Sequence, residues 1–205
     1  MKKLTPILIA IVAIAAGAFF AVQQSDRQAP EISGFAFPSP KPLAEIELID
    51  QDNALVDADF FKDKWTFIYV GYTFCPDACP MTMTIMDQLH ATLADNDELA
   101  DNVQMMLVSI DPERDTPDRL KSYVSHFNDT FVGVTGTADN LSGFASQVSA
   151  VYVVPDDRSD PNYLVDHSST IILIDPNAAV HALFTPPQAA QALAADFKIL
   201  RKHFS

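Results

Sequence analysis

The chain has 205 residues, and its 27 aspartates and glutamates outnumber its 13 lysines and arginines, for a formal net charge of −14 at pH 7. Residues 1–30 hold three of the basic side chains and one of the acidic ones, so residues 31–205 carry a net charge of −16. This acidity excludes nucleic acid as a partner. It suits a basic partner protein, or the acidic side chains simply keep the domain soluble.

The first 22 residues have the pattern of a membrane anchor. Lys2 and Lys3 precede residues 4–22, which carry no charge. As a helix, this run spans about 28 Å, close to the roughly 30 Å of a bilayer's hydrocarbon core, whereas the apolar part of a secretory signal usually has about 7–15 residues. An uncleaved anchor is therefore favoured over a signal cleaved near Ala16–Ala18. The two lysines are expected to stay in the cytoplasm, which places the rest of the chain in the periplasm, beyond a bacterial inner membrane.

Residues 23–42 follow the anchor and are rich in proline, with small and polar residues between the prolines. This composition predicts an extended tether that lifts the domain off the membrane. The remaining residues, 43–205, are enough for one domain with a sizeable core.

Residues 43–205 alternate between short apolar runs and segments with helical spacing, which is typical of an α/β domain whose central mixed sheet is flanked by helices. The expected strands are residues 44–49, 55–56, 65–72, 103–110, 131–134, 150–154, 163–165, 170–174 and 180–184. The expected helices are residues 81–93, 117–127, 138–148 and 187–203. The order of elements over residues 65–110 predicts a parallel βαβ unit, and the last two strands predict an antiparallel hairpin.

Both cysteines of the chain, Cys75 and Cys79, fall in the turn between the strand at 65–72 and the helix at 81–93. The start of a helix favours thiolate over thiol. Two cysteines four residues apart near one helical turn lie roughly 6 Å apart, close enough to form a disulfide or to share a metal ion. A purely structural disulfide is the alternative, but closing so short a loop stabilises a fold poorly. The pair therefore predicts redox or metal chemistry.

His167 is the histidine whose position best suits a third ligand, because it lies in a polar triplet between two strand-like runs. Asp166 or Ser168 could orient its ring. Two thiolates and one imidazole suit copper better than zinc, which more often recruits a fourth protein ligand in a structural site. Methionines of the helix and strand nearby could add thioethers, but they are more typical of core packing. The histidines expected to be packed or solvated instead are His90, His126, His181 and His203.

Three clusters, in this order along the chain, resemble the Sco/SenC family of membrane-anchored copper proteins: Cys75–Pro80 (CPDACP), Asp111–Asp115 (DPERD) and Tyr163–Ser168 (YLVDHS). The resemblance implies a thioredoxin-like fold with an additional hairpin, and a site for Cu(I) or Cu(II) formed by Cys75, Cys79 and His167. It also implies a metallochaperone that delivers copper to the CuA centre of cytochrome c oxidase during assembly. The implied partners are oxidase subunit II or another copper chaperone, together with a thiol reductant.

Two alternative functions use the same cysteines. A thiol-disulfide reductase would use Cys75 and Cys79 as its redox pair and would not need His167. A copper or redox sensor would change shape on loading without passing the metal on. Thioredoxins separate their cysteines by two residues, whereas this chain has three between them, which favours metal chelation. The Asp111–Asp115 segment either holds its own loop together by ion pairs or faces a partner.

Overall fold

The computed structural model describes residues 14, 29–95 and 97–204. The anchor predicted over residues 1–22, except Ile14, and the first part of the predicted tether lie outside these residues. Among the described residues, no helix combines the length and the apolar character needed to cross a membrane.

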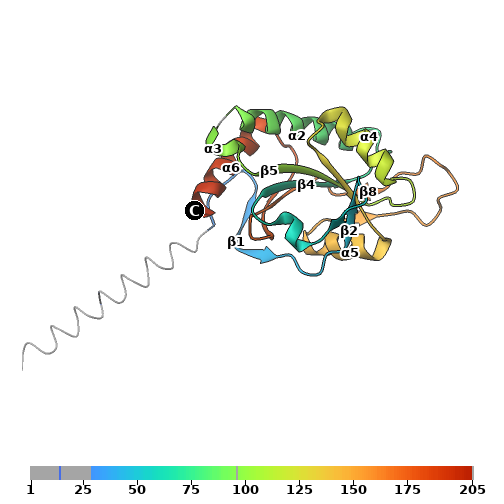
Figure 1. The fold of residues 1–205 in the computed structure, drawn as a ribbon, viewed down its shortest axis with the longest axis horizontal. Helices are drawn as coiled ribbons and strands as arrows, with labels where there is room; N and C mark the ends of the chain where they lie inside the picture. Colours follow the sequence, from blue (N-terminus) through green and yellow to red (C-terminus); the bar gives the residue numbers. More distant parts are fainter. Residues whose placement is uncertain (1–13, 15–28, 96, 205) are drawn as a thin grey trace, which may run out of the picture.

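A central mixed sheet organises the described part of the chain (Figure 1), as the sequence predicts. Its eight strands lie in the order β1-β10-β9-β4-β5-β6-β2-β3. Strands β4, β5 and β6 run parallel, and every other neighbouring pair is antiparallel. The strands are β1 Phe35–Pro42, β2 Leu48–Asp50, β3 Leu55–Val56, β4 Trp65–Gly71, β5 Val103–Ser109, β6 Val132–Thr135, β9 Ile171–Ile174 and β10 Ala179–Phe184.

The central strand β4 is buried along its whole length, which explains why its sequence is apolar and β-branched rather than alternating. It pairs with β5 from Trp65 and Val103 to Gly71 and Ser109. The predicted βαβ unit is therefore confirmed, and so is the late hairpin, which β9 and β10 form.

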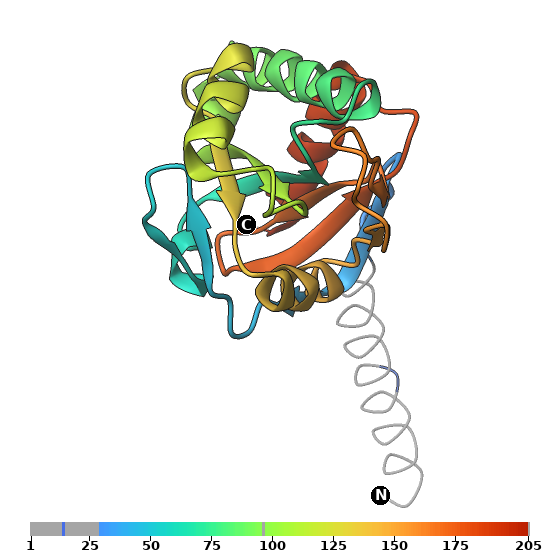
Figure 2. The same cartoon turned by 90° about the vertical axis from the view of Figure 1, so that its right-hand side faces the viewer.

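Helices cover both faces of the sheet, and Figure 2 shows α2, α4 and α6 on one face and α5 on the other. The helix α4 begins after Thr116, whose side chain accepts the Arg119 N–H, and has a proline in its first turn, as its sequence predicts. The helices are η1 Ala58–Phe61, α2 Ala78–Ala94, α3 Asp97–Ala100, α4 Pro117–Phe127, α5 Ala138–Gln147 and α6 Ala190–Phe204.

The last part of the predicted tether belongs to the sheet, because residues 35–42 form β1 and pair with β10. This strand lies at the edge, where a proline's missing N–H breaks no ladder hydrogen bond. Its register shifts between Ala36 and Lys41, the interval that contains Pro38 and Pro40. Proline content alone therefore did not distinguish a tether from an edge strand.

Three predicted strands differ from the structure, and one of them, over residues 150–154, is only shortened to Tyr152–Val153. The other two are wrong in whole or in larger part. The first, over residues 44–49, is reduced to β2, because Glu45 has φ of 28° and interrupts the extended backbone. The second, over residues 163–165, does not form: the Tyr163 N–H donates to the Asp160 carbonyl oxygen, and the Val165 N–H donates to the Tyr72 hydroxyl. The strand instead comprises the next two residues, β8 Asp166–His167, and pairs with β7 Tyr152–Val153 in a separate two-stranded sheet.

Candidate metal centre

Strand β4 and helix α2 position the two cysteines. The backbone leaves the sheet after Gly71, and the Cys75 N–H donates to the Tyr72 carbonyl oxygen at 3.4 Å. Helix α2 begins three residues earlier than the sequence predicts, so Cys79 lies in its first turn, and the Cys79 N–H lies 3.4 Å from Cys75 Sγ. Cys79 is fully buried, whereas Cys75 is only half-buried.

Gly71 makes room for the buried cysteine. A Cβ atom at this position would lie 2.8 Å from Cys79 Sγ and 3.0 Å from Cε1 of Tyr69. Real Cβ atoms do not approach other atoms so closely, so only glycine lets the helix start settle onto the end of β4.

The strand β8 brings His167 to the cysteines. Its ring nitrogen Nε2 lies 3.5 Å from Cys79 Sγ. The donor atoms of Cys75, Cys79 and His167 all lie within 4.8 Å of one another. The other ring nitrogen, Nδ1, lies 3.3 Å from the Ser168 carbonyl oxygen, so a proton on Nδ1 would leave the Nε2 lone pair free to face the sulfur. The orienting group is thus the Ser168 backbone rather than the Asp166 or Ser168 side chain.

Two tyrosines from β4 and the turn after it hold the imidazole between them. The rings of Tyr69 and Tyr72 meet His167 edge-on, with ring centroids 5.8 Å and 5.7 Å away. The Tyr72 hydroxyl accepts the Val165 N–H at 3.2 Å, which ties the segment before His167 to the cysteine turn. The sequence analysis did not identify either tyrosine, because aromatic residues in a buried strand are usually core.

Burial shifts the pKa of two of the donor residues, Cys79, which is fully buried, and His167, which is half-buried. It raises the pKa of the Cys79 thiol, while polar contacts with Tyr72 and Tyr69 act in the opposite direction. The expectation that the helix start favours thiolate is therefore wrong at Cys79, where loss of hydration outweighs the helix dipole. Burial also lowers the pKa of His167, which keeps the imidazole neutral and able to act as a ligand at neutral pH.

The acidic segment Asp111–Asp115 is built into the fold around Arg114. The Arg114 Nε donates to Asp111 Oδ2 at 2.5 Å, and the guanidinium stacks 3.4 Å from the Tyr163 ring centroid and 4.6 Å from the Phe74 ring centroid. The Tyr163 hydroxyl in turn donates to Asp111 Oδ1 at 2.6 Å. Ion pairing within Asp111–Asp115 is one of the two roles expected of these residues. Through its contacts with Phe74 and Tyr163, Arg114 also links the cysteine turn to the residues before His167.

A second carboxylate of the segment fixes the start of the cysteine turn. Asp115 is buried and accepts hydrogen bonds from the Thr73 N–H at 2.8 Å, the Thr73 hydroxyl at 2.5 Å and the Ser109 hydroxyl at 2.6 Å. The end of β5 is thereby tied to the residues just before Cys75.

The remaining histidines lie away from the donor atoms, as the sequence predicts. His181 is buried in β10 and lies 3.1 Å from Asp175 Oδ2, at the opposite end of the sheet from the cysteines. His90, His126 and His203 lie in α2, α4 and α6. Met83, Met86, Met105 and Met106 are buried in the core, whereas Met81 is 58% exposed.

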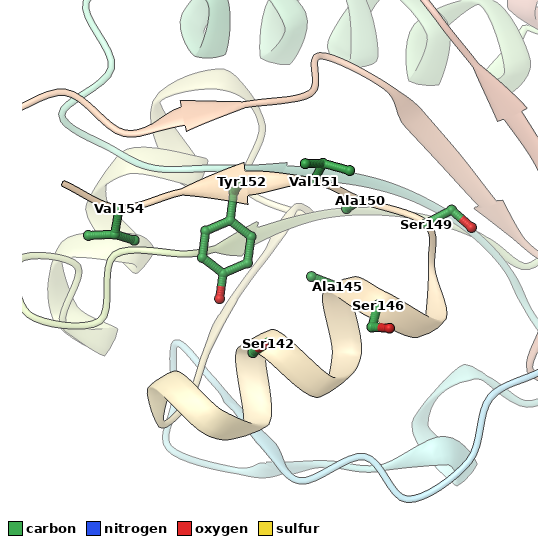
Figure 3. Close-up of a pocket in the computed structure, with 8 residues that line it drawn as sticks. All are labelled: Ser142, Ala145, Ser146, Ser149, Ala150, Val151, Tyr152 and Val154. Atoms are coloured by element: carbon green, nitrogen blue, oxygen red, sulfur yellow. The ribbon is translucent and has the colours of Figure 1, made fainter. Parts of the chain in front are cut away.

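A groove of about 670 Å³ runs between α5 and β7, and in Figure 3 the Tyr152 ring projects across it toward the helix. None of the three donor residues lines it, so the metal centre and the groove are separate features. The groove is lined by Ser142, Ala145, Ser146, Ser149, Ala150, Val151, Tyr152 and Val154.

The donor set fits a soft or borderline metal ion. It offers two sulfur atoms and one imidazole nitrogen, and among the described residues no further histidine, cysteine or carboxylate joins the group. Thiolates select Cu(I) or zinc, and imidazole allows Cu(II) as well, whereas structural zinc sites usually have four protein ligands. The half-buried Cys75 leaves one side of the group within reach of solvent.

A mixed α/β domain that joins a cysteine pair at a helix start to a histidine from a short neighbouring strand defines a thioredoxin-like class of metal-binding domains. The family model described as SCO1/SenC matches residues 40–201, and the chain belongs to this family.

Three comparisons show how far the similarity extends. A SCO2-like protein of Rickettsia felis is 39% identical over 134 residues, which are 65% of this chain and 64%, slightly under two thirds, of that protein. The copper-bound structure of Arabidopsis thaliana ScoI has a TM-score of 0.70 at 27% identity and covers 78% of this chain and 98% of its own. BsSco, described as a member of the Sco family of cytochrome c oxidase assembly proteins, shares the fold, with a TM-score of 0.62 at 18% identity over 78% of this chain and 94% of its own.

Proposed function

We propose that this protein binds one copper ion through Cys75 Sγ, Cys79 Sγ and His167 Nε2 and delivers it to the CuA centre of cytochrome c oxidase during assembly. The observation that carries the proposal is the convergence of these three donor atoms within 4.8 Å. Family membership supports it, together with the copper-bound ScoI structure and the description of BsSco.

The chain's residues have distinct parts in loading and transfer. Both cysteines must be reduced before copper arrives, because a disulfide has no thiolate to offer. Cys79 is the inner ligand, whereas Cys75 and His167 are half-buried, and Cys75 is the sulfur ligand that a partner's thiolate can approach. Transfer then proceeds by ligand exchange, with each new sulfur–copper bond forming as an old one breaks.

Residues 1–22 hold the protein in a bacterial inner membrane, and the copper-binding domain lies in the periplasm. This domain begins at β1, earlier than the predicted residue 43. Anchoring keeps the chain and oxidase subunit II, or another copper chaperone, in one plane and raises their effective concentration. The segment between the anchor and β1 is the tether of this arrangement.

A second function, thiol-disulfide reduction, is favoured by the difference in exposure between the two cysteines. The Cys75 thiolate would attack a partner's disulfide, forming a mixed disulfide and releasing one partner thiolate. Cys79 would then attack the Cys75 sulfur, releasing the second partner thiolate and leaving a Cys75–Cys79 disulfide. Two electrons pass to the partner, and a periplasmic thiol reductant restores both cysteines.

An anaerobic copper titration of the reduced full chain in detergent distinguishes the two functions. We expect one tight copper ion per chain, with thiolate-to-Cu(II) charge-transfer absorption, and an affinity at least tenfold lower in His167→Ala. His126→Ala, which removes an exposed imidazole from α4, is the matched control and should bind as the wild type does. Copper binding that is weak, or indifferent to His167, would favour the reductase.

A further inference from the structure

Tyr69 combines complete burial with an unused hydroxyl group. Its side chain is 0% exposed, in the middle of β4. The hydroxyl oxygen is buried and has no hydrogen-bond partner among the residues that the structure describes. A buried hydroxyl without a partner costs free energy, so its retention points to a partner that accepts the hydrogen bond in another state of the protein.

The surroundings of Tyr69 identify that partner. A Cβ atom at Gly71 would lie 2.8 Å from Cys79 Sγ and 3.0 Å from Cε1 of Tyr69. The Tyr69 ring and the Cys79 sulfur therefore lie on either side of the same small space. Burial raises the pKa of the Tyr69 hydroxyl, and the side chains near enough to shift this pKa further are those of Cys79, Thr82 and Ser169. A neutral thiol is a weak acceptor, whereas a thiolate that holds a metal ion keeps lone pairs that accept a hydrogen bond strongly.

We propose that the Tyr69 hydroxyl donates a hydrogen bond to Cys79 Sγ when this sulfur is a metal ligand, and that the bond favours Cu(I) over Cu(II). The inference deepens the proposed function and rests on it. Hydrogen bonds to a coordinating sulfur tune the redox balance of copper–thiolate sites. A donor withdraws electron density from the sulfur, which weakens its donation to Cu(II) more than to Cu(I). Tyr69 is thus a positioning and tuning residue rather than a ligand.

Tyr72 offers a matched control within the same site. Its ring also packs edge-on against His167, at 5.7 Å against 5.8 Å for Tyr69. Its hydroxyl, however, already accepts the Val165 N–H and is not an unused group. Tyr72→Phe therefore removes a hydroxyl beside the same imidazole and loosens the segment before His167. We expect this loosening to change the Cu(I) affinity and the Cu(II) affinity by the same factor.

The test compares Cu(I) and Cu(II) affinities of the full chain in detergent for the wild type, Tyr69→Phe and Tyr72→Phe. The loss of one hydrogen bond to a charged sulfur should lower the ratio of Cu(I) to Cu(II) affinity roughly tenfold in Tyr69→Phe. The thiolate-to-Cu(II) band should move to longer wavelength in this variant. Tyr72→Phe should keep the wild-type ratio and band position. A Tyr69→Phe ratio within twofold of the wild type, or an equal change in Tyr72→Phe, would overturn the proposal.

A readout without copper separates this proposal from the proposed function. Thiolates and imidazole also bind Co(II), which keeps its oxidation state under anaerobic conditions and gives thiolate-to-metal charge-transfer absorption. Without the hydroxyl beside the coordinating Cys79 sulfur, this band should move to longer wavelength in Tyr69→Phe and keep its position in Tyr72→Phe. If the wild type failed to bind copper but this shift appeared, the copper function would fall while the Tyr69–Cys79 interaction stood. A Co(II) band at the wild-type position in Tyr69→Phe would count against the interaction itself. Tyr69→Phe should fold as the wild type does, because the hydroxyl that it removes has no hydrogen-bond partner among the described residues.

Discussion

The two cysteines differ in exposure although they lie one helical turn apart. Cys75 is half-buried, whereas Cys79 is fully buried, and burial raises the pKa of its thiol. Thiolate is the reactive form, so we expect iodoacetamide to modify Cys75 at least tenfold faster than Cys79 in the reduced, metal-free protein. Peptide mass spectrometry of timed samples measures both rates, and urea-unfolded protein, where the rates should converge, is the control. Faster modification of Cys79 would contradict the assignment of Cys75 as the accessible ligand.

Gly71 is the residue whose replacement should damage the site without removing a ligand. In Gly71→Ala the new methyl group would lie 2.8 Å from Cys79 Sγ, so the helix start must move. We expect a loss of about 1–3 kcal/mol in the free energy of unfolding, as for other overpacked cores, together with weaker copper binding.

The matched control for Gly71→Ala is Gly143→Ala in α5, where a new Cβ meets nothing within 4 Å. A helical alanine there should stabilise the protein by about 0.5–1 kcal/mol and leave copper binding unchanged. Urea unfolding and copper titration of the two variants check both expectations. Equal stability changes in the two variants would show that the space beside Cys79 is not the determining factor.

At the scale of elements, the segment before β8 is held to the cysteine turn by side chains rather than by a strand ladder. Arg114 is central, because it pairs with Asp111 and stacks on Tyr163 and Phe74. Arg114→Lys keeps the charge but loses the planar stack. We expect a loss of about 1–2 kcal/mol in stability, weaker copper binding through His167, and faster hydrogen exchange over residues 154–168.

Arg158→Lys is the control for Arg114→Lys, because Arg158 and its partner Glu113 are both exposed. Exposed ion pairs contribute little, so its stability should stay within about 0.5 kcal/mol of the wild type. If both variants changed hydrogen exchange of the segment equally, the stacking of Arg114 would not be what holds it.

The same elements show how far sequence reasoning reaches. The parallel β4–α2–β5 unit and the β9–β10 hairpin follow from local apolar patterns, and the structure contains both. Tyr163–Val165 looked like a strand because its residues are apolar and aromatic, but its backbone is satisfied by the Tyr72 hydroxyl and by Asp160. The bond between Val165 and Tyr72 joins positions 93 residues apart and leaves no local signal. For the same reason the sequence indicated the three donor residues but not Tyr69, whose importance depends on which group lies opposite its hydroxyl.

At the scale of the whole molecule, the donor atoms and the N-terminal end of the described domain lie at opposite ends of the sheet. Ala29 and Pro30 line a cavity of about 420 Å³ with Asp175, His181 and Phe204. The ring centroids of Phe204 and Trp65 are 5.0 Å apart, and Trp65 is the first residue of β4. The cysteines follow the other end of that strand. The proposed copper site therefore faces away from the point where the chain enters the described domain.

Copper should also stabilise the whole fold, because the ligands that we propose come from two segments that only tertiary structure brings together. Cys79 and His167 are 88 residues apart in the chain, and the ion would link α2 to β8. A ligand that binds only the folded state at 100 times its dissociation constant adds about 2.7 kcal/mol to the free energy of unfolding, which for a domain of this size raises the melting temperature by about 5–10 °C. Differential scanning calorimetry of the reduced chain with and without Cu(I) measures the rise, and a Cu(I) chelator should reverse it. The Cys75→Ser, Cys79→Ser double variant should show no rise. An equal rise in that variant would place the stabilising copper elsewhere in the protein.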